Sequence, residues 1–130
     1  MIVADASAIV ELVLETVAGT AVGDRLLLPG ETIHVPHFLD VEVAHALRRY
    51  ALLGAIEAEE GEEALADLIA LPLQRHEHAP LLQRAWELRR TISVYDAMYI
   101  ALAELLSAPL VTRDRRLASA RGHDARIELF

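Results

Sequence analysis

Four acidic residues stand where a folded chain could bring their carboxylates together. Asp5 directly follows the apolar residues 1–4, and Asp114 follows a second apolar stretch. Asp96 and Glu42 each lie in a segment whose apolar residues recur at helical spacing. Converging carboxylates repel one another unless a cation neutralises them. Since hard oxygen ligands suit Mg²⁺ or Mn²⁺, and such a site activates water and stabilises charge on a phosphoryl oxygen, the set indicates phosphodiester hydrolysis.

Three of these acids also have a simpler explanation as helix caps. Asp5 and Asp114 each precede a short helical pattern, and an acid there can satisfy free backbone amides. Ser93, three residues before Asp96, completes the spacing of a capping box. For these positions the sequence leaves capping and ligation open.

Glu42 is the most informative of the four acids. We expect it inside a helix over residues 37–53, on the face that also carries Leu39 and Ala46. Capping does not explain an acid there, so Glu42 must be paired, lie at an edge or bind a ligand. Arg48 or Arg49 would be the partner in an ion pair.

The remaining chain alternates strands with helices. We expect strands at residues 1–4, 32–35, 72–77, 109–112 and 125–129. Helices are expected through Val13 and at residues 16–27, 37–53, 56–71, 80–90, from Ser93 onward and at 114–121. In the helix after Ser93 the apolar residues form one stripe. This alternation predicts a parallel sheet covered on both faces, with Asp5 and Asp114 at the carboxyl ends of strands, where such sheets bind ligands.

Composition limits the class of protein. A length of 130 residues with 54% hydrophobic residues predicts one folded domain, residues 1–130. No apolar run reaches the length of a membrane helix, so a cytoplasmic location without a membrane partner is expected. The absence of Cys excludes disulfides and thiolate sites. The net charge of −8 disfavours nucleic-acid binding, although five acids cluster in one stretch, residues 57–63.

Four segments resemble the PIN-domain family, and more narrowly the VapC-type ribonuclease toxins of toxin–antitoxin pairs. They are Val-Ala-Asp-Ala-Ser at residues 3–7, Asp-Val-Glu-Val-Ala-His-Ala-Leu at 40–47, Tyr-Asp-Ala-Met-Tyr-Ile-Ala-Leu-Ala at 95–103, and Thr-Arg-Asp-Arg-Arg-Leu at 112–117. They occur in order and at family-like spacing over essentially the whole chain.

The resemblance implies an α/β fold: a PIN-like three-layer α/β/α architecture whose mostly parallel sheet has about five strands in the order 3-2-1-4-5. It also implies a metal-dependent endoribonuclease that uses Mg²⁺ or Mn²⁺. The catalytic, metal-binding acids would be Asp5, Glu42, Asp96 and Asp114. Ser7 and Thr112 would support them, and the expected RNA contacts are Arg113, Arg115 and Arg116.

The same resemblance implies two partners besides RNA: a small VapB-like antitoxin, and a second copy of the chain in a homodimer or a toxin–antitoxin hetero-oligomer. An antitoxin would cover apolar surface expected on residues 43–69. Three other classes fit less well. An aspartyl-phosphate phosphatase needs a second Asp where Ser7 stands, and a receiver domain needs a Lys that the chain lacks. A catalytically degenerate PIN-like module that binds only RNA or protein would lack an acid, and none is missing.

Overall fold

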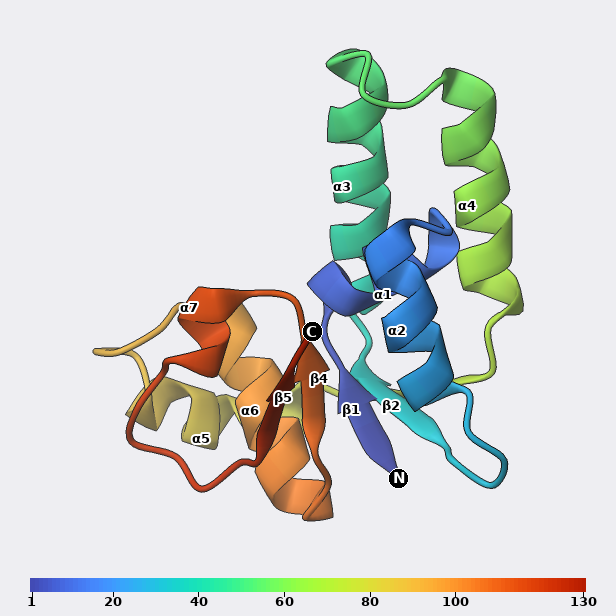
Figure 1. Cartoon of the computed structure of the whole chain (residues 1–130). Coiled ribbons are helices and arrows are strands. Elements are labelled where there is room, and N and C mark those ends of the chain that lie inside the picture. The colour runs from blue at the N-terminus through green and yellow to red at the C-terminus, as the bar shows by residue number, and fades with distance from the viewer.

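The computed structural model describes residues 1–130 and contains one sheet of five parallel strands, in the order β3-β2-β1-β4-β5 (Figure 1). The predicted class and strand order are therefore confirmed. The strands are β1 (Ile2–Ala4), β2 (Ile33–Pro36), β3 (Leu73–His76), β4 (Leu110–Thr112) and β5 (Ile127–Leu129).

Helices connect the strands and cover both faces of the sheet. They are α1 (Ala6–Val13), α2 (Val17–Leu26), α3 (Leu39–Leu52), α4 (Ala58–Ala70), α5 (Ala79–Glu87), α6 (Val94–Leu106) and α7 (Arg115–Ala118). Right-handed crossovers place α1 to α4 on one face, and the return from β3 to β4 places α5 and α6 on the other. The helices α3 and α4 rise as an antiparallel pair beyond the rest of the molecule (Figure 1).

No single helix is long and apolar enough to cross a membrane. The helices α1 and α2 would pass that test of length and composition only as a pair, and the chain bends by 112° between them.

The core differs from the sequence expectation at α6. Its apolar residues were expected to form one stripe, but seven consecutive residues, Ala97 to Ala103, are all buried, while Leu105 is 63% exposed. The helix lies between the sheet and α5, so apolar contacts surround its middle. It therefore behaves as a central element of the core rather than as a surface helix, and it holds Asp96 rigidly at its first turn.

The helix α1, which begins directly after Asp5, packs closely against α2. This approach depends on Gly19, because a Cβ atom at this position would lie 2.1 Å from the carbonyl oxygen of Glu11. The backbone of α1 could make room for this Cβ atom only by a shift that would also move the start of the helix. Gly19 thus links the packing of α2 to the position of Asp5.

We expect Gly19→Ala to lower the free energy of unfolding by roughly 1–3 kcal/mol, the usual cost of an overpacked core. Gly61→Ala is the matched control, since its Cβ would lie 3.6 Å from Ile56 Cδ1, an ordinary contact. That variant should raise the free energy of unfolding by about 0.5–1 kcal/mol, because alanine favours the helix over glycine. Urea denaturation measures both, and equal effects of the two variants would contradict this account of Gly19.

Candidate active site

Asp5 lies at the carboxyl end of β1 and is only 5% exposed. Its Oδ1 accepts hydrogen bonds from Ser7 Oγ at 2.7 Å and from the Ala8 amide at 3.0 Å. Its Oδ2 accepts one from Thr112 Oγ1 at 2.6 Å. Burial raises the pKa of Asp5, the nearby Asp114 charge adds to this effect, and the hydrogen bonds oppose it. Asp5 therefore caps α1 through the Ala8 amide, as the simpler explanation predicted. The other two hydrogen bonds, from Ser7 and Thr112, are not capping bonds and fix the buried carboxylate in place.

The Thr112 hydroxyl also positions Asp114. The strands β1 and β4 are neighbours, with Ala4 paired to Val111, so both acids lie at the same edge of the sheet. Thr112 Oγ1 accepts a hydrogen bond from the Asp114 amide at 2.9 Å. Asp114 Oδ1 in turn accepts one from the Arg116 amide at 2.7 Å, which caps α7. Burial would raise the pKa of Asp114, but the Arg116 amide and guanidinium outweigh it, so that the pKa is lowered.

Glu42 occupies a different place in its helix from the one expected. The helix α3 begins at Leu39 rather than at residue 37, because the chain turns at His37 and Phe38 after the end of β2. Glu42 is therefore in the first turn, where the helix dipole favours an acid. The ion pair with Arg48 or Arg49, which was the alternative to a bound ligand, does not form.

The partner of Glu42 is Tyr99, whose hydroxyl donates a hydrogen bond to Glu42 Oε2 at 2.5 Å. Burial raises the pKa of Glu42; the hydrogen bond from Tyr99 lowers it, and the charges of Asp96 and Asp5 raise it further. Glu42 and Asp96 line the same cavity, so α3 presents Glu42 to the edge of the sheet where Asp96 lies. Glu42 is thus a half-buried acid whose nearest charged neighbours have the same sign.

Asp96 forms half of the expected capping box. Ser93 Oγ accepts a hydrogen bond from the Asp96 amide at 3.1 Å, as predicted, but the Asp96 carboxylate makes no reciprocal bond to the Ser93 amide. Burial raises the pKa of Asp96, with a further rise from the Asp114 charge, while Ser93 and Arg116 lower it. Asp96 also lines an open cavity, where a ligand can reach its carboxylate.

Tyr99 was not identified from the sequence. It is 2% exposed, and burial, followed by the adjacent Glu42 charge, strongly raises the pKa of its hydroxyl. It therefore remains a proton donor at any physiological pH. Its position in the sequence could have indicated this role, because Tyr99 lies three residues after Asp96 and so on the same helical face. A buried tyrosine hydroxyl also normally has a hydrogen-bond partner.

A cavity of about 720 Å³ opens beside Glu42 and Asp96. Its other lining residues include Thr91, Ser93, Tyr95, Arg116 and Arg121. Of the three arginines expected to contact RNA, Arg116 alone lines this cavity. Arg113 donates a hydrogen bond to the Phe130 carbonyl oxygen at 2.6 Å, and Arg115 is exposed.

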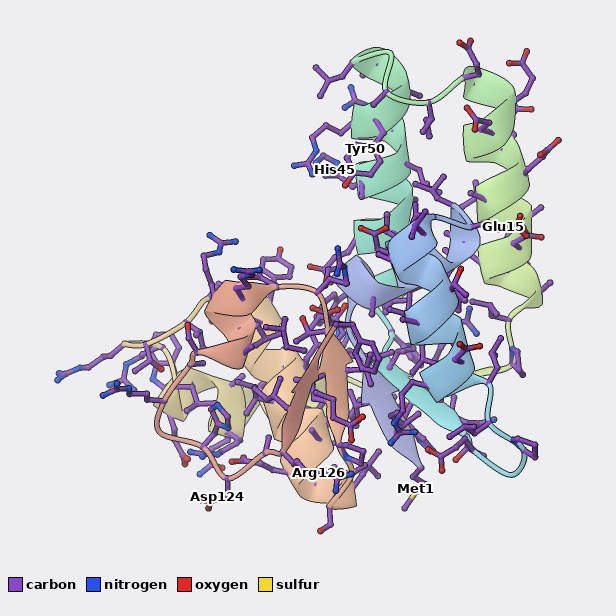
Figure 2. The ribbon with its side chains drawn as sticks, in the orientation of Figure 1. Met1, Glu15, His45, Tyr50, Asp124 and Arg126 are labelled. Atoms are coloured by element: carbon purple, nitrogen blue, oxygen red, sulfur yellow. The ribbon has the colours of Figure 1, made fainter.

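A second cavity of about 730 Å³ lies at the other end of the sheet, around Asp124 and Arg126 (Figure 2). An ion pair between Arg84 and Glu104, 2.7 Å apart, forms part of its lining. None of the four acids borders it. The cavity beside Glu42 and Asp96 is therefore the one that is relevant to chemistry.

The four carboxylates affect one another in a continuous series, from Glu42 to Asp5 and Asp96, and from both aspartates to Asp114. Their oxygen ligands suit a hard divalent cation. In the structure, however, no three Asp, Glu or His side chains are arranged as a group that could hold a metal ion. Asp5 and Glu42 are instead turned toward their hydroxyl donors. The chemistry of the donors fits a metal, and binding would require the carboxylates to turn toward one another.

Comparison with known proteins identifies the family. The family model described as PIN domain matches residues 2–122. The chain belongs to the PIN-domain family. A relative, Ribonuclease VapC12 from Mycobacterium tuberculosis, is 49% identical over 129 residues, which cover 99% of this chain and 98% of the relative.

Solved structures agree with this assignment. PAE2754 from Pyrobaculum aerophilum has a TM-score of 0.70 and 28% identity, over 96% of this chain and 81% of its own. VapBC2 from Rickettsia felis, solved bound to a DNA fragment from its promoter, has a TM-score of 0.71 over 99% of this chain and 98% of its own. At 16% identity, this second structure supports only the PIN-domain fold.

The raised pKa of Asp96 predicts how charge at this edge affects stability. A carboxyl group whose pKa is raised on folding does not lower the free energy of unfolding at pH values below its unfolded pKa, which is close to 3.8 for Asp96. The decrease grows as pH rises and is complete above the folded pKa. We therefore expect metal-free Asp96→Asn to exceed the metal-free parent in free energy of unfolding at pH 7, by roughly 1 kcal/mol for this partly solvated group.

Thermal melts in EDTA from pH 7 down to pH 4 test this expectation, because the advantage of Asp96→Asn should shrink as pH falls. The same substitution at the exposed Asp24 is the control and should change little. Added Mg²⁺ should reverse the order at pH 7, since a ligand of the folded state stabilises the parent more. Parent and variant curves that coincide with and without Mg²⁺ would show that the Asp96 carboxylate neither opposes folding nor binds the cation.

Proposed function

We propose that this chain is a metal-dependent endoribonuclease and the toxin of a toxin–antitoxin pair. The observation that carries the proposal is that Asp5, Glu42 and Asp96 lie on one edge of the sheet, where Glu42 and Asp96 line an open cavity, and that burial is the first cause of a raised pKa in each. Acids held in this way are typical of a catalytic site rather than a surface. The name of the relative VapC12, a ribonuclease, supports RNA as the substrate.

Asp5, Glu42, Asp96 and Asp114 would hold the cation, Mg²⁺ or Mn²⁺. When bound, it would activate water and stabilise the charge that develops on a phosphoryl oxygen. Asp5 is the most firmly placed of the acids, because three donors fix its carboxylate. All four belong to one unit, since residues 1–130 fold around a single sheet and act as a single PIN domain.

The remaining polar groups orient these acids. Ser7 and Thr112 donate hydrogen bonds to Asp5, and Tyr99 donates one to Glu42. Each hydroxyl group therefore orients a carboxylate and need not contact the substrate itself. The Arg116 guanidinium lies 3.4 Å from Asp114 Oδ2 and lines the cavity, where it can attract an RNA phosphate. Arg113 and Arg115 contribute positive charge at longer range.

The antitoxin would bind along the projecting α3–α4 pair. An apolar groove of about 250 Å³ runs between these helices and is lined by Ala44, Leu47, Arg48, Ala51, Ala58, Gly61, Glu62 and Leu65. Large apolar side chains on the same pair are strongly exposed, among them Val41 at 71% and Ile69 at 72%. Such a surface is typical of a site that a partner helix covers. A homodimer stays a prediction that light scattering can test.

Cleavage of a labelled single-stranded RNA should require Mg²⁺ or Mn²⁺ and stop in excess EDTA. Asp5→Asn and Glu42→Gln keep the shape of the side chain but remove the charge that holds the cation, so each should reduce kcat/KM by at least about a hundredfold. Asp24→Asn, on the exposed surface, is the matched control and should cleave like the parent. Undiminished cleavage in EDTA, or by Asp5→Asn, would refute the metal-dependent mechanism, whereas no cleavage by the parent with either cation would favour a binding module.

The groove predicts a separate class of variants. Leu65→Glu places a charge in the apolar groove and should weaken binding of the cognate antitoxin at least tenfold, by about 1.4 kcal/mol or more. RNA cleavage should be unchanged, because Leu65 lies on α4 away from the acids. Leu82→Glu, on a half-exposed residue of α5, is the control. Calorimetry with the product of a reading frame directly upstream measures both, and equal binding by the two variants would exclude this groove.

A further inference from the structure

The exposed ring of Tyr95 forms part of the wall of the cavity that contains Glu42 and Asp96. Tyr95 is 63% exposed, although it directly precedes Asp96 at the start of a buried helix. Its ring meets the Phe38 ring at 5.5 Å and a right angle, and Phe38 also contacts Tyr99 at 5.4 Å. The Tyr95 ring is thus braced from the core, while a large part of it remains open to the cavity.

Positive charge lies in the same cavity. Arg116 and Arg121 both line it, and the Arg116 side chain is 89% exposed. A guanidinium can bind a phosphate through two parallel hydrogen bonds. The cavity therefore combines an aromatic surface, two guanidinium groups and two of the four acids, Glu42 and Asp96. The apolar α3–α4 groove has no such combination and suits a peptide instead.

We infer that Tyr95 forms a nucleobase subsite next to the catalytic acids. One base of a single-stranded RNA stacks on the Tyr95 ring, and Arg116 and Arg121 contact the adjoining phosphates. The inference rests on the proposed ribonuclease function and specifies how that site holds its substrate. A cavity of about 720 Å³ lies within the usual range of ligand pockets, about 300–1,000 Å³.

This subsite would select for strandedness more than for sequence. Every base presents an aromatic face, so stacking tolerates all four bases. A base within a duplex is already stacked on its neighbours and cannot also lie on Tyr95. The subsite thus accepts a base that is splayed out of a loop or a single strand.

Binding can be measured apart from cleavage in an Asp5→Asn background. Asp5 does not line the cavity, and Asn caps a helix well, so the fold should persist. With a fluorescein-labelled eight-nucleotide single-stranded RNA, fluorescence anisotropy should show Kd raised about 5- to 150-fold by Tyr95→Ala, the usual range for one stacked base. Tyr95→Phe keeps the ring and should bind like the background protein. Trp86→Ala removes another exposed aromatic residue, 62% exposed on α5, and should have no effect.

A series of RNAs that each lack one base locates the contact. For one RNA of the series, the effect of Tyr95→Ala should disappear, because the base that stacks on the ring is absent. Equal losses across the series, Kd unchanged by Tyr95→Ala, or no RNA binding at all would overturn the subsite. Cleavage by the parent chain is scored separately, so a ribonuclease that binds RNA independently of Tyr95 disproves the subsite but not the proposed function.

Discussion

The buried carboxylate of Asp5 is the interaction on which both the fold and the site depend. A charge that is 5% exposed is costly unless donors surround it, and here donors come from the start of α1 and from the end of β4. The strand β1 pairs with β4, far away in sequence, and Ser7 and Thr112 bind the same side chain. The bonds that satisfy Asp5 therefore also fix the edge of the sheet where chemistry can occur.

This arrangement sets stability against function. Burial and like charges raise the pKa of Asp5, Glu42 and Asp96, so the ionised site opposes folding of the metal-free chain. Rigid neighbours keep the acids together in spite of this cost. The helix α6 is buried around its whole middle, and Asp40 on α3 forms an ion pair with Arg75 on β3 at 2.7 Å. Both helices that present acids are thus anchored outside the site.

The cavity beside Asp96 and the groove between α3 and α4 suit different kinds of ligand. The cavity beside Asp96 is polar, with arginines on its wall, whereas the groove between α3 and α4 is largely apolar. His45 and Tyr50 mark α3 above the carboxyl ends of the strands, and Met1 marks the opposite end of the sheet (Figure 2). The helix α3 therefore connects the two regions, because it contributes Glu42 to the first and Ala44 and Leu47 to the second.

The sequence by itself determined the sheet order, through its resemblance to a family, and the placing of Asp5 and Asp114 at strand ends, through local apolar patterns. It also identified Ser93 as a cap, because capping depends on residues three apart. Only the tertiary structure decided that Tyr99, 57 residues away, binds Glu42, and that Phe38 braces Tyr95. It also placed Glu42 in the first turn of its helix and buried the middle of α6 on all sides. These features depend on which elements meet across the sheet, and a periodic pattern shows that a face is apolar without showing what covers it.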